Sequence, residues 1–416
     1  MNKVIKSLCL KSSVQAVVTG LVLCGLMGFL GCVLCSAPSW SPDSSQVALL
    51  CALPQDDPNQ FRLVTYDVAA GRHRIIDEVA GKGVLSAPAW SPDGQWIAYY
   101  RVMPAPADPN QPISAPLTED NALIPGFLFD IAKTQWEAPD PNKTFNVELV
   151  LTHPDGSQAK TLRTMPWPDS KDGLNQLTVL SPTWSKDASR LFYTYPIDDL
   201  FMIVEIEVAT GHTRACALSS VGMARISPDD RWIATLLEDQ SKQWLVELTR
   251  LDGSMQKSVR IPLHPDSASN VVLFGGLSWS ADGLSVLVAS DKQCLIVNTV
   301  TGQTRAYQDP GIKEIAYAVQ APQGEQVYYL AGLEKADPNA DTEPVELRRG
   351  DLSTGRVQTL LRLTDVPGVE DVGRLSVAPS GKTVLVRCTT GLLIWDGQTS
   401  RVVETAPWMT EPWRKQ

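Results

Sequence analysis

The chain has 416 residues, of which 44% are hydrophobic and 20% are charged, and its formal net charge at pH 7 is −10. This length would ordinarily accommodate two or three domains, but an array of repeats of the same length closes as one domain. An acidic balance without a stripe of basic residues argues against nucleic acid as a partner.

The first 35 residues have the composition of a targeting segment. Three lysines precede Ala16–Leu34, an uncharged apolar run long enough to cross a membrane as a helix. The lysines place the N-terminus in the cytoplasm and the rest of the chain outside it. We favour an uncleaved signal anchor. A lipoprotein signal cut before an acylated Cys32 is the second interpretation, because Phe29–Cys32 is similar to a bacterial lipobox, and a signal peptide cut after Ala37 is the third. All three export the protein, and the first two anchor it to the bacterial cell envelope.

A hairpin pattern dominates the rest of the chain. In PAWSPDGQWIAYY, residues 88–100, an apolar run ends at Trp90, a Ser-Pro-Asp-Gly turn follows, and a second apolar run begins. Proline sets φ at the second turn position, and Asp and Gly suit the positions that close the turn, so the pattern predicts a β-hairpin. Seven copies occur, at residues 38–50, 88–100, 182–194, 224–236, 277–289, 318–330 and 375–387.

A second hairpin-like unit follows each copy and turns at a glycine, as in FRLVTYDVAAGRHRIID after the first copy. Two hairpins give four strands. Successive turns are about 41 to 57 residues apart, except for one gap of about 94, and four-stranded units at this period are typical of β-propellers. We therefore predict an all-β fold: a seven-bladed β-propeller of four-stranded antiparallel blades, preceded by an N-terminal hydrophobic helix.

The Trp-Ser-Pro-Asp-Gly hairpin followed by an x-Thr-Gly turn resembles the TolB-like β-propeller family, a relative of the WD40-like repeat propellers. The resemblance covers about residues 36–405 and implies architecture rather than one function, because members include interaction scaffolds, periplasmic partners of envelope machines and propellers fused to peptidases. The aromatic position is matched by Trp40, Trp90, Trp184 and Trp279. The departures are Ile226, Gln320 and Val377 at that position, and Gln323 and Ser380 in place of the turn aspartate.

Blade two contains an insertion, residues 102–145, inside the propeller that spans residues 36–405. A loop this long in a compact domain is uncommon and usually functional or disordered. Its ends are rich in proline, but its middle is too apolar for a disordered segment. One interpretation, favoured by helix-like spacing, is a short helix folded back onto the blades, and the other is a surface that contacts a partner or the membrane. The residues concerned are Phe127, Phe129, Ile131 and Trp136.

Topology predicts that the N-terminal segment, the insertion, an enlarged loop in blade six and the tail of residues 406–416 share one face. We call this face the insertion face. In a four-stranded blade it is the face where the first strand begins, where the second strand connects to the third, and where the fourth strand ends. Trp408 and Trp413 of the tail lie near basic residues, as at membrane interfaces. We expect both to contact a partner or lipid, and the tail is also a candidate latch for a ring without a shared strand.

The propeller shows no catalytic or metal-binding motif. Its cysteines, Cys51, Cys216, Cys294 and Cys388, lie in four different blades and form no Cys-x-x-Cys or Cys/His cluster, so we expect buried thiols, although disulfides between blades remain an alternative. Four histidines lack metal-ligand spacing. No phosphate-binding glycine loop and no Gly-x-Ser-x-Gly motif occurs. We predict no metal, no cofactor and no catalytic residue.

Three classes of function remain for a monomeric propeller. We favour a non-enzymatic module, anchored in the cell envelope, that binds an envelope protein partner. The alternatives are a glycan or small-molecule binder and a hydrolase or lyase with its site in the central channel. The channel distinguishes them: converging Asp, Glu or His residues would indicate an enzyme, a ring of aromatic residues a ligand binder, and a plugged or featureless channel the protein-binding module.

Overall fold

The computed structural model describes the propeller and not the N-terminal segment. The described residues are 37–52, 61–79, 83–106, 144–168, 177, 180–197, 200–220, 222–239, 241, 243–261, 276–290, 293–322, 325–334, 344–369, 372–388, 391–405 and 407–408. The hydrophobic helix expected within residues 1–35 lies outside them. Within the described ranges, no helix is both long and apolar enough to cross a membrane.

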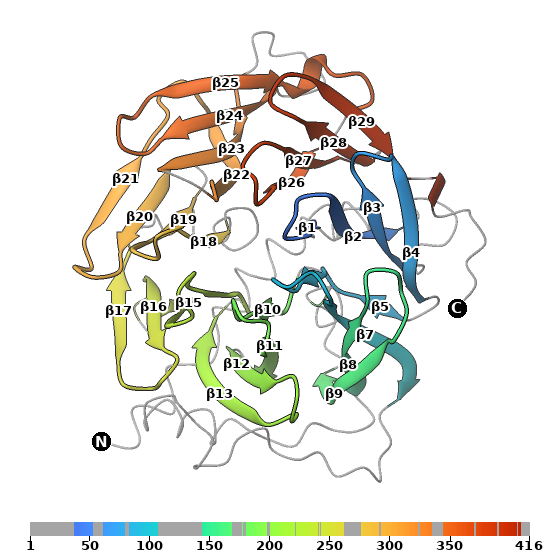
Figure 1. Ribbon diagram of the computed structural model, residues 1–416. Coiled ribbons are helices and arrows are strands. Elements are labelled where there is room, and N and C mark those ends of the chain that lie inside the picture. The colour runs from blue at the N-terminus through green and yellow to red at the C-terminus, as the bar shows by residue number, and fades with distance from the viewer. Residues whose placement is uncertain are drawn as a thin grey trace.

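The described residues form seven antiparallel sheets arranged in a ring, with the first strand of each blade innermost (Figure 1). This confirms the predicted seven-bladed propeller. Blades one to three contain β1 (Ser39–Trp40), β2 (Gln46–Ala52), β3 (Phe61–Asp67), β4 (Arg72–Val79); β5 (Val84–Leu85), β6 (Ala89–Trp90), β7 (Ile97–Pro106), β8 (Thr144–Thr152), β9 (Lys160–Pro168); and β10 (Thr183–Trp184), β11 (Arg190–Ile197), β12 (Leu200–Glu207), β13 (Thr213–Ser219).

Blades four to seven follow the same order. They contain β14 (Ala224–Ile226), β15 (Trp232–Glu238), β16 (Trp244–Arg250), β17 (Gln256–Arg260); β18 (Leu277–Trp279), β19 (Ser285–Ala289), β20 (Cys294–Asn298), β21 (Thr304–Tyr307); β22 (Glu314–Gln320), β23 (Gln326–Gly332), β24 (Val345–Asp351), β25 (Val357–Arg362); and β26 (Val372–Val377), β27 (Val384–Cys388), β28 (Gly391–Trp395), β29 (Ser400–Glu404). A short 3-10 helix, η6 (Leu363–Asp365), follows β25.

Blade two departs from four strands because its first strand is interrupted. β5 and β6 both pair with β7, at Val84↔Val102 and Ala89↔Ala98. Pro88, which has no N–H to donate, lies between them. Ser86 bridges the gap: its N–H donates to the Tyr100 carbonyl at 3.0 Å and its hydroxyl accepts from the Tyr100 N–H at 2.8 Å. β5 and β6 together therefore take the place of a single first strand in blade two.

Local hydrogen bonds explain why the Ser-Pro-Asp-Gly pattern turns the chain. In blade three, the Ser185 hydroxyl donates to Asp187 Oδ1 at 2.6 Å and accepts from the Arg190 N–H at 3.0 Å. The first of these bonds, the largest contribution, helps to lower the pKa of Asp187 to about 2. Blade seven has Ala378 in place of the serine, yet its turn still closes through backbone bonds, such as Gly381 N–H to the Ala378 carbonyl at 2.8 Å. The departures from the repeat therefore leave the hairpin intact.

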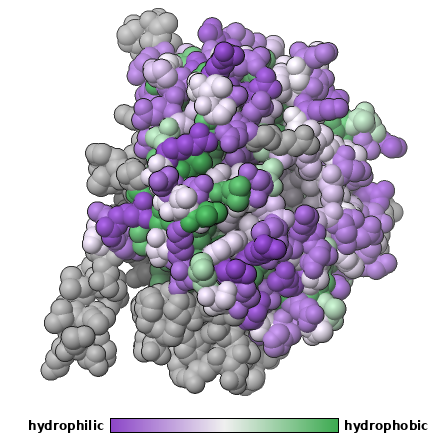
Figure 2. All heavy atoms as spheres, turned by 60° about the vertical axis from the view of Figure 1, so that its left-hand side comes forward, coloured by the Kyte–Doolittle hydropathy of each residue, from purple (hydrophilic) through white to green (hydrophobic). Residues whose placement is uncertain are grey.

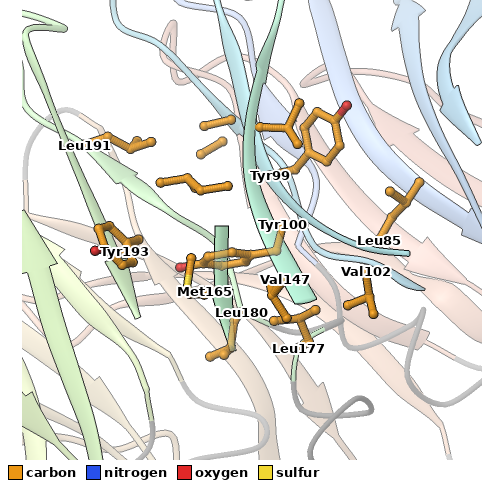
Figure 3. Packing of buried hydrophobic residues seen from close by; sticks show 14 of the residues in the cluster. Leu85, Tyr99, Tyr100, Val102, Val147, Met165, Leu177, Leu180, Leu191 and Tyr193 are labelled. Atoms are coloured by element: carbon orange, nitrogen blue, oxygen red, sulfur yellow. The ribbon is translucent and has the colours of Figure 1, made fainter. Parts of the chain in front are cut away.

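The core lies between neighbouring blades, because successive residues of a strand point to opposite sides of its sheet. Tyr99 and Tyr100 of β7 point in opposite directions (Figure 3). The Tyr99 hydroxyl donates to Asp77 Oδ2 of blade one at 2.6 Å, and the Tyr100 hydroxyl accepts from the Thr194 N–H of blade three at 2.7 Å. Adjacent tyrosines thus connect blade two to both neighbours.

The ring closes without a shared strand. Among the described residues, every blade takes its strands from one continuous stretch of chain, so blades one and seven meet only through side chains and loops (Figure 1). The Arg387 Nη2 group of β27 donates to the Leu50 carbonyl of β2 at 2.9 Å. The Ser380 N–H donates to the Ser44 hydroxyl at 3.1 Å. The described strands therefore show that the ring closes by packing between blades, as we expected.

The C-terminal segment crosses this seam. Trp408 is 5% exposed, and its ring stacks on Tyr66 at 5.3 Å and on His73 at 4.7 Å between centroids. Its carbonyl accepts a hydrogen bond of 2.5 Å from Nη1 of Arg62, a buried residue of β3. Trp408 belongs to a core cluster that contains residues of both blades one and seven. This part of the tail therefore holds the last blade against the first.

The strands on either side of the insertion are longer than the sequence predicted. β7 continues to Pro106 and β8 begins at Thr144, with Pro106 opposite Phe145 after a register shift. The face of the propeller seen in Figure 2 is mainly hydrophilic, with a group of hydrophobic side chains near its centre. The large apolar residues that are exposed within the described ranges are Met255, Leu284, Val300 and Val357.

Candidate functional site

The first strands place one set of side chains toward the ring axis and the next set into the core between blades. The residue before the aromatic position is small in most blades and mostly only partly buried, whereas the tryptophans pack into the core clusters. The small residues are Ser39, Ala89, Thr183, Ser278, Val319 and Ser376, whereas blade four has Arg225. A guanidinium group therefore projects where the other blades have short side chains.

Hydrogen bonds between first strands hold this inner layer in place. The Trp184 and Trp279 indole N–H groups donate to the carbonyls of Ala89 and Arg225 in the preceding blades, at 3.1 and 2.9 Å. The Thr183 hydroxyl donates to the Ala224 carbonyl at 3.3 Å. Since the Arg225 backbone accepts from Trp279, the strand that carries the guanidinium is fixed on the side of blade five.

Two further large side chains come from blades six and seven. Tyr317 of β22 and Arg374 of β26 are 5% and 7% exposed, and Arg374 Nη1 lies 3.5 Å from the Tyr317 hydroxyl. The Arg374 guanidinium carbon is 5.2 Å from the centroid of the Tyr317 ring, a cation–π contact. Gly276 of blade five lies beside Tyr317, since a Cβ added to Gly276 would be 3.4 Å from the Tyr317 hydroxyl, an ordinary van der Waals contact.

Arg225, Tyr317 and Arg374 form one electrostatic cluster, which we call the channel cluster. Burial lowers the pKa of Arg225; the Tyr317 hydroxyl opposes this effect and the Arg374 guanidinium adds to it. The Nη1 group of Arg225 donates to the carbonyl of Ala224 at 2.9 Å. Among the described residues, no carboxylate forms an ion pair with Arg225. The cluster therefore suits an anionic group, since guanidinium groups bind carboxylate and phosphate oxygens in a fixed fork geometry.

The channel cluster is spread along the first strands. Each first strand runs away from the insertion face toward its hairpin turn, and Tyr317 and Arg374 precede the aromatic position by three residues, whereas Arg225 precedes it by one and so lies next to that turn. Acid–base groups are scarce around it: the described first strands carry one carboxylate, Glu314, and no histidine. In the part of the chain that the structure describes, no group of His, Cys, Asp and Glu side chains could hold a metal ion.

Most of the predicted contact residues fall outside the described ranges. These are Phe127, Phe129, Ile131, Trp136 and Trp413, together with the proposed acylation site Cys32. Trp408 is described and lies buried on blade one, so a partner reaches its indole only when the tail leaves the seam. Its role as a contact residue stays a prediction.

Sequence reasoning missed the channel cluster because its members come from three blades. Aligning the seven repeats on the aromatic position would have provided a signal. Position −1 then contains one charged residue, Arg225, among small ones, and position −3 contains Tyr317 and Arg374 among Ala37, Ala87, Ser181, Met223 and Gly276.

The four propeller cysteines are all buried, and none forms a disulfide. Burial raises the pKa of Cys216 and of Cys294 to about 12. Because the thiolate is the reactive form, maleimide should label these cysteines in the native full-length protein at least about 100-fold more slowly than after unfolding. Peptide mass spectrometry would locate the label. Native labelling at the rate of an exposed thiol, or a disulfide-linked peptide, would contradict this expectation.

No protein-family model matches the chain, and no curated protein matches it significantly in sequence. Several solved structures match its fold. Oligogalacturonate lyase from Vibrio parahaemolyticus is 11% identical with a TM-score of 0.52, over 86% of this chain and 88% of that one. Hydrazine synthase from Kuenenia stuttgartiensis is 14% identical with a TM-score of 0.50, over 89% and 95%. TolB from Acinetobacter baumannii is 14% identical with a TM-score of 0.39, over 83% and 75%. At these identities the likeness concerns the fold alone, and with the seven sheets it makes this chain a β-propeller.

Proposed function

We propose that the protein is a non-enzymatic binding module of the bacterial cell envelope. In this proposal, residues 1–35 export and anchor a propeller whose insertion face binds a protein partner. The observation that carries the proposal is the channel cluster. Arg225, Tyr317 and Arg374 come together from the first strands of three blades, and the last two are almost completely buried.

The chemistry of the channel favours binding over catalysis. Glycoside hydrolysis ordinarily uses two carboxylates on opposite sides of the scissile bond, and general acid–base catalysis uses a group that titrates near the working pH. The described first strands provide guanidinium groups, a phenol and small hydroxyls around a single carboxylate. Such groups attract and orient an anion and do not move protons at neutral pH.

The partner we propose carries an acidic segment that enters the channel mouth. The chain as a whole has a net charge of −10, so the cationic channel cluster is a local exception that would attract an acidic segment. Arg225 is the most exposed member of the cluster, because it is only partly buried, whereas Tyr317 and Arg374 are 5% and 7% exposed. Electrostatic complementarity of this kind provides specificity and orientation.

The insertion is proposed to supply the apolar part of the contact. Phe127, Phe129, Ile131 and Trp136 belong to the segment between β7 and β8, and Trp413 belongs to the tail. The second and third strands of a blade connect at the face where its first strand begins, so these residues and the channel cluster are proposed to act on the same partner. Localisation outside the cytoplasmic membrane follows from the export segment and is part of the same proposal.

Crosslinking and affinity purification from native membranes tests the proposal. Four full-length proteins are compared: wild type, Arg225→Gln with Arg374→Gln, a variant with residues 104–142 replaced by a Gly-Ser linker, and Arg231→Gln. Arg231 lies on the same blade, and its side chain is 71% exposed, so it controls for the loss of charge. We expect the double variant to reduce recovery of one specific protein by at least about tenfold. We expect Arg231→Gln to recover it as wild type does.

The variants separate the two parts of the contact. Loss of the same protein from the linker variant would assign the apolar contact to the insertion. If all four proteins recover the same set, neither the channel cluster nor the insertion recognises a partner and the proposal is wrong. Circular dichroism of each purified variant would show that a lost interaction does not result from unfolding.

A further inference from the structure

A second arginine cluster lies away from the channel, in the seam between blades one and seven. Arg387 of β27 is 3% exposed. Its Nη2 group donates to the Leu50 carbonyl at 2.9 Å. Its Nε and Nη1 groups are buried and have no hydrogen-bond acceptor among the described residues. Buried N–H groups are nearly always bonded, and those of a charged group are the costliest to leave unbonded.

A second buried guanidinium lies close by in the same seam. Arg62 of β3 is 4% exposed, donates from Nε to Glu78 at 2.5 Å and from Nη1 to the Trp408 carbonyl at 2.5 Å. Arg387 also forms a hydrogen bond with the Cys51 thiol, which follows Leu50 in β2, and both Arg387 and Arg62 act electrostatically on this thiol. Burial raises the pKa of Cys51 despite these two cations, so the thiol is neutral near pH 7.

The charges of this seam do not balance within the described residues. Two guanidinium groups contribute two positive charges, and Glu78 is the carboxylate paired with either of them. A water molecule could accept from Nε and Nη1 of Arg387, but it would leave the second positive charge uncompensated in a buried site. A negative ion would both accept the hydrogen bonds of Arg387 and compensate the second positive charge.

We propose that the seam binds a small inorganic anion, of which chloride is the commonest, between Arg387 of the last blade and Arg62 of the first. The anion accepts hydrogen bonds from Nε and Nη1 of Arg387. Because the two arginines belong to opposite sides of the seam, a bound anion links the first and last blades, which are not consecutive in the chain. The site is independent of the channel cluster, and its failure would leave the proposed function untouched.

Thermal unfolding of the full-length protein tests the proposal. Sodium gluconate, whose anion is too bulky for a buried site, is replaced by sodium chloride at constant ionic strength. A ligand that binds the folded state alone raises the unfolding midpoint with its concentration. We expect the wild-type midpoint to rise by about 2–4 °C in chloride. We expect Arg387→Met to have the same midpoint in both salts.

One control and one direct observation complete the test. Arg231→Met removes an exposed guanidinium and should retain the wild-type response to chloride. In crystals of the wild-type protein grown with sodium bromide, an anomalous peak is expected within hydrogen-bond distance of Arg387 Nε or Nη1, and this measurement needs no folded variant. Equal wild-type midpoints in both salts with no bromide peak would show that water alone fills the site. A chloride response that survives in Arg387→Met would likewise overturn the proposal.

Discussion

Replacing Trp408 with alanine is expected to lower the free energy of unfolding by about 3–5 kcal/mol, the range for removing a large aromatic side chain from a core. The indole is 5% exposed and stacks on both Tyr66 and His73. The lost stability comes from the seam between blades one and seven, which is held by side-chain packing because the two blades share no strand. Chemical denaturation followed by circular dichroism would measure the loss.

Two further measurements distinguish a seam contact from an ordinary core residue. Trp408→Phe keeps a stacking ring and should recover more than half of the loss, whereas Met255→Ala, at a residue 52% exposed, should cost less than about 0.5 kcal/mol. In Trp408→Ala, amide hydrogen exchange should accelerate in β2–β4 and β27–β29 before it does in blade four. A uniform acceleration around the ring, or a loss no larger than that of Met255→Ala, would refute a closing role for Trp408.

Replacing Arg348 with methionine is expected to lower the free energy of unfolding by about 3–5 kcal/mol at neutral pH, because it leaves the buried Asp309 carboxylate without its cation and leaves Glu346 with only the half-exposed Arg362. Arg348 of β24 donates to Asp309 at 2.6 Å and to Glu346 at 2.8 Å, and both carboxylate side chains are 5% exposed. Asp309 follows β21, and Tyr329 of β23 also donates to it at 2.7 Å, so the network spans the seam between blades five and six.

The pH dependence of this variant follows from the direction of the pKa shifts. Burial alone raises the pKa of Asp309 and of Glu346, but hydrogen bonds, including those from Arg348, outweigh it and lower both below their ordinary values of 3.8 and 4.5. Carboxyl groups with lowered pKa stabilise the fold above those ordinary values, and this contribution is lost as the pH falls through the lowered ones. Without Arg348, fewer hydrogen bonds oppose the effect of burial, so we expect the pKa of both carboxyls to rise.

The difference between wild type and Arg348→Met should therefore be largest near pH 7 and shrink as the pH falls below about 4.5. Unfolding midpoints in denaturant, measured for both proteins across this range, would test it. Arg231→Met is the matched control, because its pair with Asp229 is 3.7 Å long and both side chains are largely exposed, so a loss below about 1 kcal/mol is expected. An Arg348→Met loss as small as this, or one independent of pH, would contradict the argument.

Features of the fold that depend on neighbours in sequence were predictable. The Ser185–Asp187 bond joins residues two apart, and the glycine turns of the second hairpins need only local conformational freedom, as Gly211 shows with a φ of +73°. Such local rules, repeated seven times, were enough to predict the number of blades and their strands. The ends of the insertion were predicted less well, because the pairing of Pro106 with Phe145 depends on a register shift that no local pattern encodes.

The contacts that close the ring and form the site were beyond local rules. Arg62 and Trp408 are 346 residues apart, and Arg387 and Leu50 are 337 residues apart. Arg225, Tyr317 and Arg374 meet only because the ring brings three first strands to one axis. Each of these arginines looks like an ordinary surface charge in the sequence, and only the closed ring reveals that it is buried or faces the channel.

The contiguity of the blades has a consequence for how the protein is made. Each sheet contains strands from one unbroken stretch of chain, so its backbone hydrogen bonds can be completed as soon as that stretch has left the ribosome. The junction of blades one and seven is different, since it needs both of these blades to have been synthesised. During synthesis the propeller therefore exists as an open arc, which becomes a ring when blade seven and the segment up to Trp408 have been added.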